Sequence, residues 1–91
     1  MRIVTVCGAG VGTSAILATT VRRALARLDV EADVAPSSTD DLARDAADAQ
    51  LVLTTPEWFT RVRAEAGTAH VAVVDRIMDL DAVTSLLERE L

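Results

Sequence analysis

Short apolar runs along the chain have the length and composition of buried β-strands. They span residues 2–6, 51–54 and 70–74 and are rich in β-branched side chains. A continuous apolar run indicates a strand that is covered on both faces, as in a parallel sheet. Residues 30–35 instead alternate apolar with acidic side chains, with Glu31 and Asp33 on one face. This alternation predicts a half-exposed strand at the edge of the sheet.

Amphipathic segments follow the predicted strands and indicate helices. One of them starts with Thr55-Pro56-Glu57, in which a capping hydroxyl precedes a proline at the first helical position. This helix is expected to stop at Gly67, because glycine readily adopts the left-handed conformation that ends helices. The last helix is expected to be capped by Asp79 or Asp81. The predicted helices span residues 13–28, 40–47, 56–66 and 80–91.

The alternation of strand and helix defines the expected fold class. It predicts an α/β three-layer sandwich, in which a four-stranded parallel sheet carries helices on both faces. Right-handed crossovers and short connections favour the strand order 2-1-3-4, a Rossmann-like or flavodoxin-like arrangement. Residues 1–91 are expected to form a single domain, because a chain of this length has no room for a second core. Ligands of such sheets bind at the carboxyl ends of the strands where the winding reverses, here between the first and third strands.

Composition narrows the range of functions. The net charge is −5 and every basic side chain is an arginine, so the chain lacks the basic patch that nucleic-acid binding requires. The single cysteine cannot form an internal disulfide, and a lone thiol suits a reducing compartment. The sequence has no secretory leader pattern, and no apolar run approaches the ~20 residues of a membrane-spanning helix. We therefore expect a cytoplasmic protein.

One stretch, Cys7-Gly8-Ala9-Gly10-Val11-Gly12-Thr13-Ser14, carries the candidate chemistry. Its glycines allow backbone N–H groups to turn toward a phosphate, and the helix that follows adds donors and a partial positive charge. In such surroundings the pKa of a cysteine is expected to fall into the ~3.5–7.5 range, so Cys7 would be a thiolate at neutral pH. The stretch predicts a phosphate-binding loop that begins with a nucleophile, and hence phosphoryl transfer on sulfur.

Hydroxyl side chains lie next to this loop and have two interpretations each. Thr13 and Ser14 can cap the first helix, contact the bound anion, or do both. Thr54 and Thr55 follow the third strand, whose carboxyl end is expected beside the loop. They are interpreted first as a strand end and a helix cap, and second as phosphate contacts.

Other polar residues are predicted to lie away from the loop. His70 opens the fourth strand, which places it at the amino end of the sheet. Asp75-Arg76 follows the same strand at the opposite end, but two strands from Cys7, or about 10 Å. Cys7 and His70 are the soft metal ligands of the chain and are predicted at opposite ends of the sheet. We therefore expect no metal and no organic cofactor.

The loop resembles that of the IIB component of the bacterial sugar phosphotransferase system (PTS). The resembling features are a cysteine after the first strand and Gly-x-Gly-x-Gly-Thr-Ser opening a helix. The likeness is to the small lactose, ascorbate and galactitol types, and closest to the ascorbate and galactitol branch. The resemblance implies that Cys7 accepts a phosphoryl group from a phosphohistidine of the IIA protein. It further implies transfer from Cys7 to a sugar at the membrane IIC component.

Two other functions fit part of the pattern. Low-molecular-weight tyrosine phosphatases and arsenate reductases also place a cysteine on a phosphate loop after the first strand. Their loop needs an arginine fork for the phosphoryl oxygens, and the corresponding position here is Thr13. A phosphorylation-sensing regulatory module without turnover is the third hypothesis. The missing arginine favours a carrier, which must hold a phosphoryl group without hydrolysing it.

Overall fold

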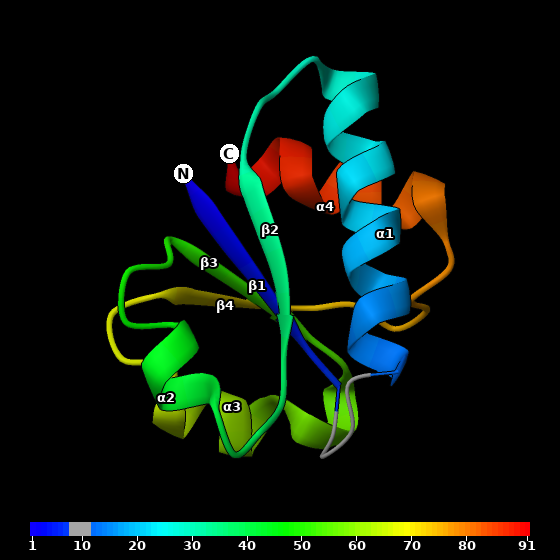
Figure 1. The fold of residues 1–91 in the computed structure, drawn as a ribbon. Helices are drawn as coiled ribbons and strands as arrows, with labels where there is room; N and C mark the ends of the chain where they lie inside the picture. The colour runs from blue at the N-terminus through cyan, green and yellow to red at the C-terminus, as the bar shows by residue number, and fades with distance from the viewer. Residues whose placement is uncertain (8–11) are drawn as a thin grey trace.

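The computed structural model describes residues 1–7 and 12–91, and within them four parallel strands form one sheet in the order β2-β1-β3-β4. The predicted order and the alternation of strands and helices are thereby confirmed (Figure 1). The strands are β1 (Arg2–Val6), β2 (Asp33–Ser37), β3 (Leu51–Thr54) and β4 (His70–Val73). The helices are α1 (Gly12–Leu28), α2 (Leu42–Asp45), the 3₁₀ turn η1 (Pro56–Trp58), α3 (Phe59–Glu65) and α4 (Leu80–Glu90).

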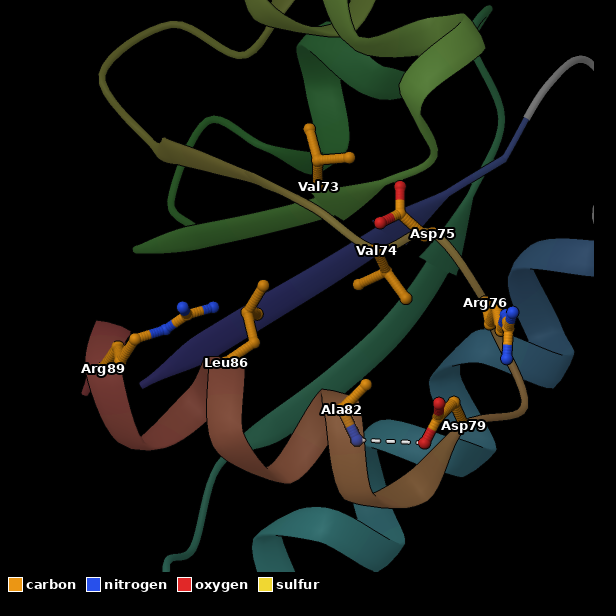
Figure 2. Close-up of a pocket in the computed structure, with 8 residues that line it drawn as sticks. All are labelled: Val73, Val74, Asp75, Arg76, Asp79, Ala82, Leu86 and Arg89. Atoms are coloured by element: carbon orange, nitrogen blue, oxygen red, sulfur yellow. Dashed lines mark hydrogen bonds between the residues drawn. The ribbon is translucent and has the colours of Figure 1, made fainter.

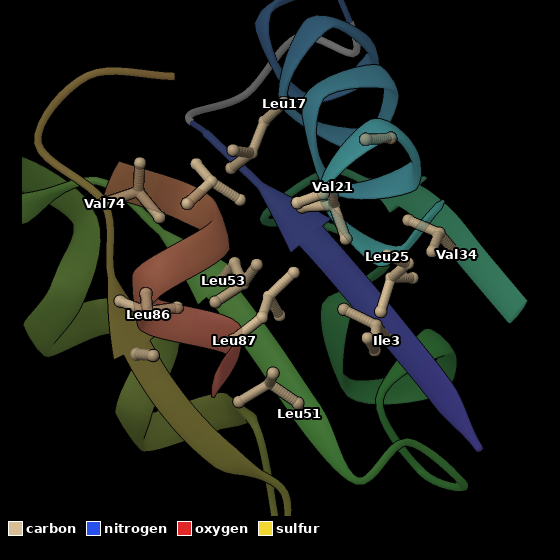
Figure 3. Close-up of a cluster of buried hydrophobic side chains, with 14 of the residues drawn as sticks. Ile3, Leu17, Val21, Leu25, Val34, Leu51, Leu53, Val74, Leu86 and Leu87 are labelled. Carbon is tan, nitrogen blue, oxygen red and sulfur yellow. The ribbon is translucent and has the colours of Figure 1, made fainter. Parts of the chain in front are cut away.

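Helices cover both faces of the sheet, which creates two hydrophobic clusters (Figure 1). Alternate side chains of a strand point to opposite faces, so each strand contributes to both clusters. On the face of α1 and α4, the packed residues include Ile3, Leu17, Val21, Leu53 and Leu87 (Figure 3). On the face of α2 and α3, they include Val4, Val6, Leu42, Val52 and Val62.

A buried hydrogen bond joins β1 to the start of α1. The hydroxyl of Thr5 donates to the backbone carbonyl of Ser14 over 2.8 Å, and both residues are fully buried. The bond gives a polar side chain in the apolar layer a partner, which removes the cost of burying it unpaired. It also fixes the first turn of α1 above the carboxyl half of β1.

The second strand begins later than the sequence pattern predicts. It runs from Asp33 to Ser37 instead of 30–35, and it contains Pro36, a residue type that is more usual in turns. Proline fits here because β2 is an edge strand, so the missing N–H of Pro36 breaks no bond to β1. The helix after it is also shorter than the predicted range 40–47 and covers Leu42–Asp45.

The first and third helices start differently from the prediction. Helix α1 begins at Gly12, so Thr13 and Ser14 lie within its first turn and are not its N-cap. The segment after Thr55 begins as the 3₁₀ turn η1, and the side chain of Thr55 makes no capping hydrogen bond. Pro56 has no N–H, and the N–H of Trp58 donates to the backbone carbonyl of Thr55 over 3.1 Å, so fewer N–H groups at this start need a side-chain cap.

The predicted helix ends are confirmed at two places. Gly67 has a φ of 66°, the left-handed conformation that terminates a helix without steric cost for glycine. Asp79 caps α4, because its side chain accepts a hydrogen bond of 3.0 Å from the backbone N–H of Ala82. Among the described residues, no helix combines the length and apolar character needed to span a membrane.

Candidate functional site

Cys7 directly follows β1, an inner strand of the sheet, at the edge formed by the strands' carboxyl ends. The register places Val6 level with Ser37 of β2 and Thr5 level with Leu53 of β3. Extending the pairing of β1 with β3 by two residues brings Cys7 level with Thr55. The winding of the sheet reverses between β1 and β3, so Cys7 lies where ligands of this fold class bind.

The side chain of Cys7 points toward the layer of α1 and α4. It belongs to the same buried cluster as Ile3 and Leu17, and 8% of the residue is exposed. Thr55 continues the alternation of β3 in extended conformation, so it shares this face with Leu53 and Cys7. Thr54 faces the opposite layer with Val52. Of the two candidate threonines, Thr55 is therefore the one on the side of the sulfur.

Buried hydroxyls lie at or just after the carboxyl ends of β3 and β2. Thr54 and Thr55 are buried, and their hydroxyls have no hydrogen-bond partner among the described residues. The same holds for Thr39, in the connection after β2. Buried polar atoms are nearly always hydrogen-bonded in proteins. Three unpartnered hydroxyls at one edge of the sheet indicate a place where a polar ligand can bind.

The predicted loop is described in part. Gly8, Ala9, Gly10 and Val11 lie outside the described residues. Gly12 opens α1, and a Cβ built on it would meet no atom of the described residues within 4 Å, apart from its chain neighbours and the backbone of α1 itself. Thr13 is exposed, whereas Ser14 is fully buried beneath the first turn of α1.

The expected lowering of the Cys7 pKa is wrong for the described structure. The pKa of Cys7 is raised to about 11, mainly by burial and secondly by the nearby carboxylate of Glu57. Both causes act against the charged form, because a thiolate loses hydration on burial and is repelled by a like charge. At neutral pH the free protein therefore holds Cys7 as a thiol.

Replacing Glu57 with glutamine is expected to lower the pKa of Cys7, while leaving it above its usual value of 9.0, because burial is the larger cause. The measurement is the rate of alkylation by iodoacetamide against pH. The half-maximal rate should fall near pH 11 in the wild type and at lower pH in Glu57→Gln. Glu31→Gln, in the connection before β2, is the matched control and should leave the profile unchanged. A wild-type midpoint below pH 8 would contradict this account.

The same pKa predicts how stability depends on pH. A thiol whose pKa is raised in the folded state stabilises the protein below its unfolded pKa, near 9.0. That contribution is lost as the pH rises through about 11, because the unfolded chain loses the proton first. The free energy of unfolding should therefore fall between these pH values by about 1–2 kcal/mol, and this fall should be absent in Cys7→Ala.

The other polar residues lie where the sequence predicts. His70 is at the amino end of β4, and its Nε2 lies 3.1 Å from the carboxylate of Glu90. Asp75 and Arg76 line a pocket of about 410 Å³ beside β4 and α4, and Cys7 is not among its lining residues (Figure 2). Within the described ranges, no group of three or more residues is arranged to hold a metal ion.

Two features of the site were missed by reasoning from the sequence. Glu57 was interpreted only as part of a helix start, yet its charge acts on Cys7. Thr39 was not among the candidate site residues, yet it adds a third buried hydroxyl that has no partner among the described residues. A signal for Thr39 was present, because hydroxyl residues occupy the end of each strand beside β1 and the positions after it, at 37–39 and 54–55.

Together, the parallel sheet, the cysteine after β1 and the hydroxyl-rich carboxyl edge define a small α/β protein with a candidate nucleophile at the edge where ligands of this fold class bind. The family model described as "PTS system, Lactose/Cellobiose specific IIB subunit" matches residues 2–88. The chain therefore belongs to the PTS IIB family and is a phosphoryl-transfer component of a sugar phosphotransferase system.

A solved structure supports the fold. The lactose-specific IIB component domain of the phosphoenolpyruvate:carbohydrate phosphotransferase system from Streptococcus pneumoniae is similar, with a TM-score of 0.70. The likeness covers 97% of this chain and 95% of that one at 17% sequence identity. No curated protein matches the chain. The closer likeness to the ascorbate and galactitol branch stays a prediction.

Proposed function

We propose that this chain is a cytoplasmic phosphocarrier in which Cys7 receives a phosphoryl group from a phosphohistidine of IIA. Cys7 then passes the group to a sugar at the membrane IIC component. The observation that carries the proposal is the position of Cys7, after inner strand β1 and level with Thr55 at the winding switch. Residues 1–91 act as one domain in this proposal, with no metal or organic cofactor.

The two transfers balance without an external base. In the first, the S–P bond forms as the N–P bond of phosphohistidine breaks, and the proton of the Cys7 thiol goes to the leaving imidazole nitrogen. In the second, the sugar oxygen attacks phosphorus, the S–P bond breaks, and the sulfur recovers a proton from the sugar hydroxyl. A thiol with a raised pKa suits this cycle, because the sulfur begins and ends protonated.

The surroundings of Cys7 can stabilise a transferred phosphoryl group. The hydroxyl groups of Thr54 and Thr55 can each donate a hydrogen bond to a phosphoryl oxygen. Thr55 lies on the same face of the sheet as the sulfur of Cys7. Helix α1 begins at Gly12, and the first N–H groups of a helix are available to an anion. The loop Gly8, Ala9, Gly10 and Val11 completes the proposed cradle, with Thr13 and Ser14 at its end. Such fixed donors stabilise charge without reorganising during transfer.

The assay that tests the proposal uses phosphorylated IIA, the protein and a membrane preparation holding IIC. A carrier takes up one phosphoryl group and passes it to the sugar, whereas a regulatory module takes it up without turnover. Para-nitrophenyl phosphate distinguishes the phosphatase alternative, which requires brisk hydrolysis dependent on Cys7. We expect transfer to sugar and slow hydrolysis. The reverse pattern would contradict the carrier proposal.

Gly12→Ala tests the cradle separately from the fold. Apart from the chain neighbours and the backbone of α1, no atom of the described residues lies within 4 Å of the added Cβ, so the folded state should accommodate it with unchanged or slightly higher stability. If a phosphoryl group approaches the start of α1, the methyl group should slow uptake from IIA by about tenfold, or ~1.4 kcal/mol of transition-state stabilisation. Stability is measured by urea unfolding and uptake by radiolabel. An unchanged rate of phosphoryl uptake in Gly12→Ala would contradict the proposal that the phosphoryl group binds next to Gly12.

A further inference from the structure

Glu57 lies at the carboxyl edge of the sheet, close to the position that is level with Cys7. The extended pairing of β1 with β3 places Thr55 level with Cys7, and Glu57 follows Thr55 by two residues. Neighbouring strands are about 4.8 Å apart and consecutive Cα atoms about 3.8 Å, so the Cα atom of Glu57 lies within about 12 Å of that of Cys7.

A short 3₁₀ turn holds Glu57 in this position. The ring of Pro56 fixes one backbone dihedral, and the N–H of Trp58 donates to the carbonyl of Thr55 over 3.1 Å. Glu57 is the residue between Pro56 and Trp58, so its backbone is fixed relative to the end of β3. The residue is exposed, so a substitution there should disturb little packing.

The carboxylate of Glu57 is not neutralised by a neighbouring cation. Within the described ranges, no arginine lies at ion-pair distance from it, and its side chain makes no hydrogen bond. The carboxylate of Asp41, in the connection after β2, is by contrast 3.6 Å from the guanidinium of Arg44. The charge of Glu57 therefore acts on its surroundings with no opposition except screening by water and salt. It is the second cause, after burial, of the raised pKa of the Cys7 thiol.

We propose that Glu57 sets the phosphoryl-transfer equilibrium of Cys7, because it repels the phosphoryl group once that group is on the sulfur. This rests on the proposed transfer from IIA to Cys7. In that step the S–P bond forms, the N–P bond of phosphohistidine breaks, and the thiol proton goes to the imidazole nitrogen. An uncharged thiol is thereby replaced by a phosphoryl group with a charge of about −1.5 to −2 at neutral pH. Glu57 therefore destabilises the phosphorylated form and leaves the free thiol uncharged.

This repulsion opposes the attraction that the rest of the site supplies. The hydroxyl of Thr55 and the first N–H groups of α1 can stabilise a bound phosphoryl group. A site with donors alone would retain the group, whereas a carrier must pass it on to the sugar. A nearby carboxylate raises the free energy of the phosphorylated form and so favours delivery. Removing this charge is expected to strengthen uptake from IIA and to weaken delivery to the sugar.

The equilibrium between phosphorylated IIA and the full chain tests this inference. The two proteins are mixed, and the phosphorylated fraction of each is measured by intact mass. Glu57→Gln should shift the equilibrium toward phosphorylated Cys7 by about threefold to tenfold, as expected for charges roughly 10 Å apart in a high dielectric. Glu57→Asp keeps the charge and should stay within about twofold of the wild type.

Salt distinguishes an effect of charge from a structural one. The Debye length falls from about 10 Å at 0.1 M to about 3 Å at 1 M, so the shift in Glu57→Gln should shrink over this range. Glu31→Gln removes the same charge from an exposed position before β2, at the opposite end of the sheet, and is the matched control. It should leave the equilibrium unchanged.

The possible outcomes separate this inference from the proposed function. Normal uptake with the same equilibrium in Glu57→Gln and the wild type would overturn the role of Glu57 and leave the carrier function standing. An equal shift in Glu31→Gln, or a shift in Glu57→Gln that does not depend on salt, would also overturn that role. A wild type that takes up no phosphoryl group would overturn the carrier function, and the role of Glu57 with it.

Discussion

Cys7→Ser should abolish uptake of a phosphoryl group from phosphorylated IIA, with a loss of at least about thousandfold. The reason is chemical, because a serine hydroxyl has a far higher pKa and is a weaker nucleophile than sulfur toward phosphorus. The exchange is small and local, and it costs about 1 kcal/mol for placing a hydroxyl in a mostly apolar position. The measurement is radiolabel transferred per chain, with folding checked by circular dichroism.

A folded Cys7→Ser that still takes up phosphate would contradict the carrier proposal outright. Gly12→Ala serves as an informative comparison, because it alters the same region with the sulfur in place. It should be slowed by about tenfold, whereas Cys7→Ser should show no transfer above background. Equal effects of the two substitutions would mean that sulfur has no special role.

Leu53→Ala should lower the free energy of unfolding by about 3 kcal/mol, the second large effect that we expect. Leu53 is fully buried on the inner strand β3 and packs in the cluster beneath α1 and α4 (Figure 3). Removing its side-chain atoms loses their transfer free energy and leaves a cavity that a close-packed interior fills only in part. A domain of this size has only a small margin of stability, so this loss is a large share of the total.

Urea unfolding followed by circular dichroism measures this effect. Ile16→Ala is the matched control, because Ile16 is also aliphatic but is 45% exposed on α1. The control should change the free energy of unfolding by less than about 1 kcal/mol, since alanine is a good helix former. Equal losses in the two variants would contradict the assignment of Leu53 to the central core.

The strand order was predictable because it follows from a few strong signals. The continuous apolar runs marked β1, β3 and β4 as strands, and right-handed crossovers then left few arrangements, although β4 is an edge strand. The position of Cys7 at the carboxyl edge followed directly from that order. The position of His70 was equally predictable. It is the first residue of a parallel strand, so it lies at the amino end of the sheet, opposite the end that holds Cys7.

Other features depend on contacts that the sequence does not display. The alternation at 30–35 indicated a strand, but pairing with β1 from Arg2 onward moved β2 to Asp33–Ser37. The pKa of Cys7 was predicted from the glycine loop alone, whereas burial and the charge of Glu57 determine its direction. Burial is a property of packing among several segments, so a single stretch of sequence does not reveal it.

The central claim is that the sulfur of Cys7 carries the phosphoryl group. The most direct measurement is the intact mass of the protein after incubation with phosphorylated IIA, followed by peptide mapping. The account predicts one phosphoryl group per chain, located on the peptide containing Cys7 and lost again when sugar and the IIC component are added. A protein that gains no phosphoryl group, or gains it on any other residue, would contradict the account.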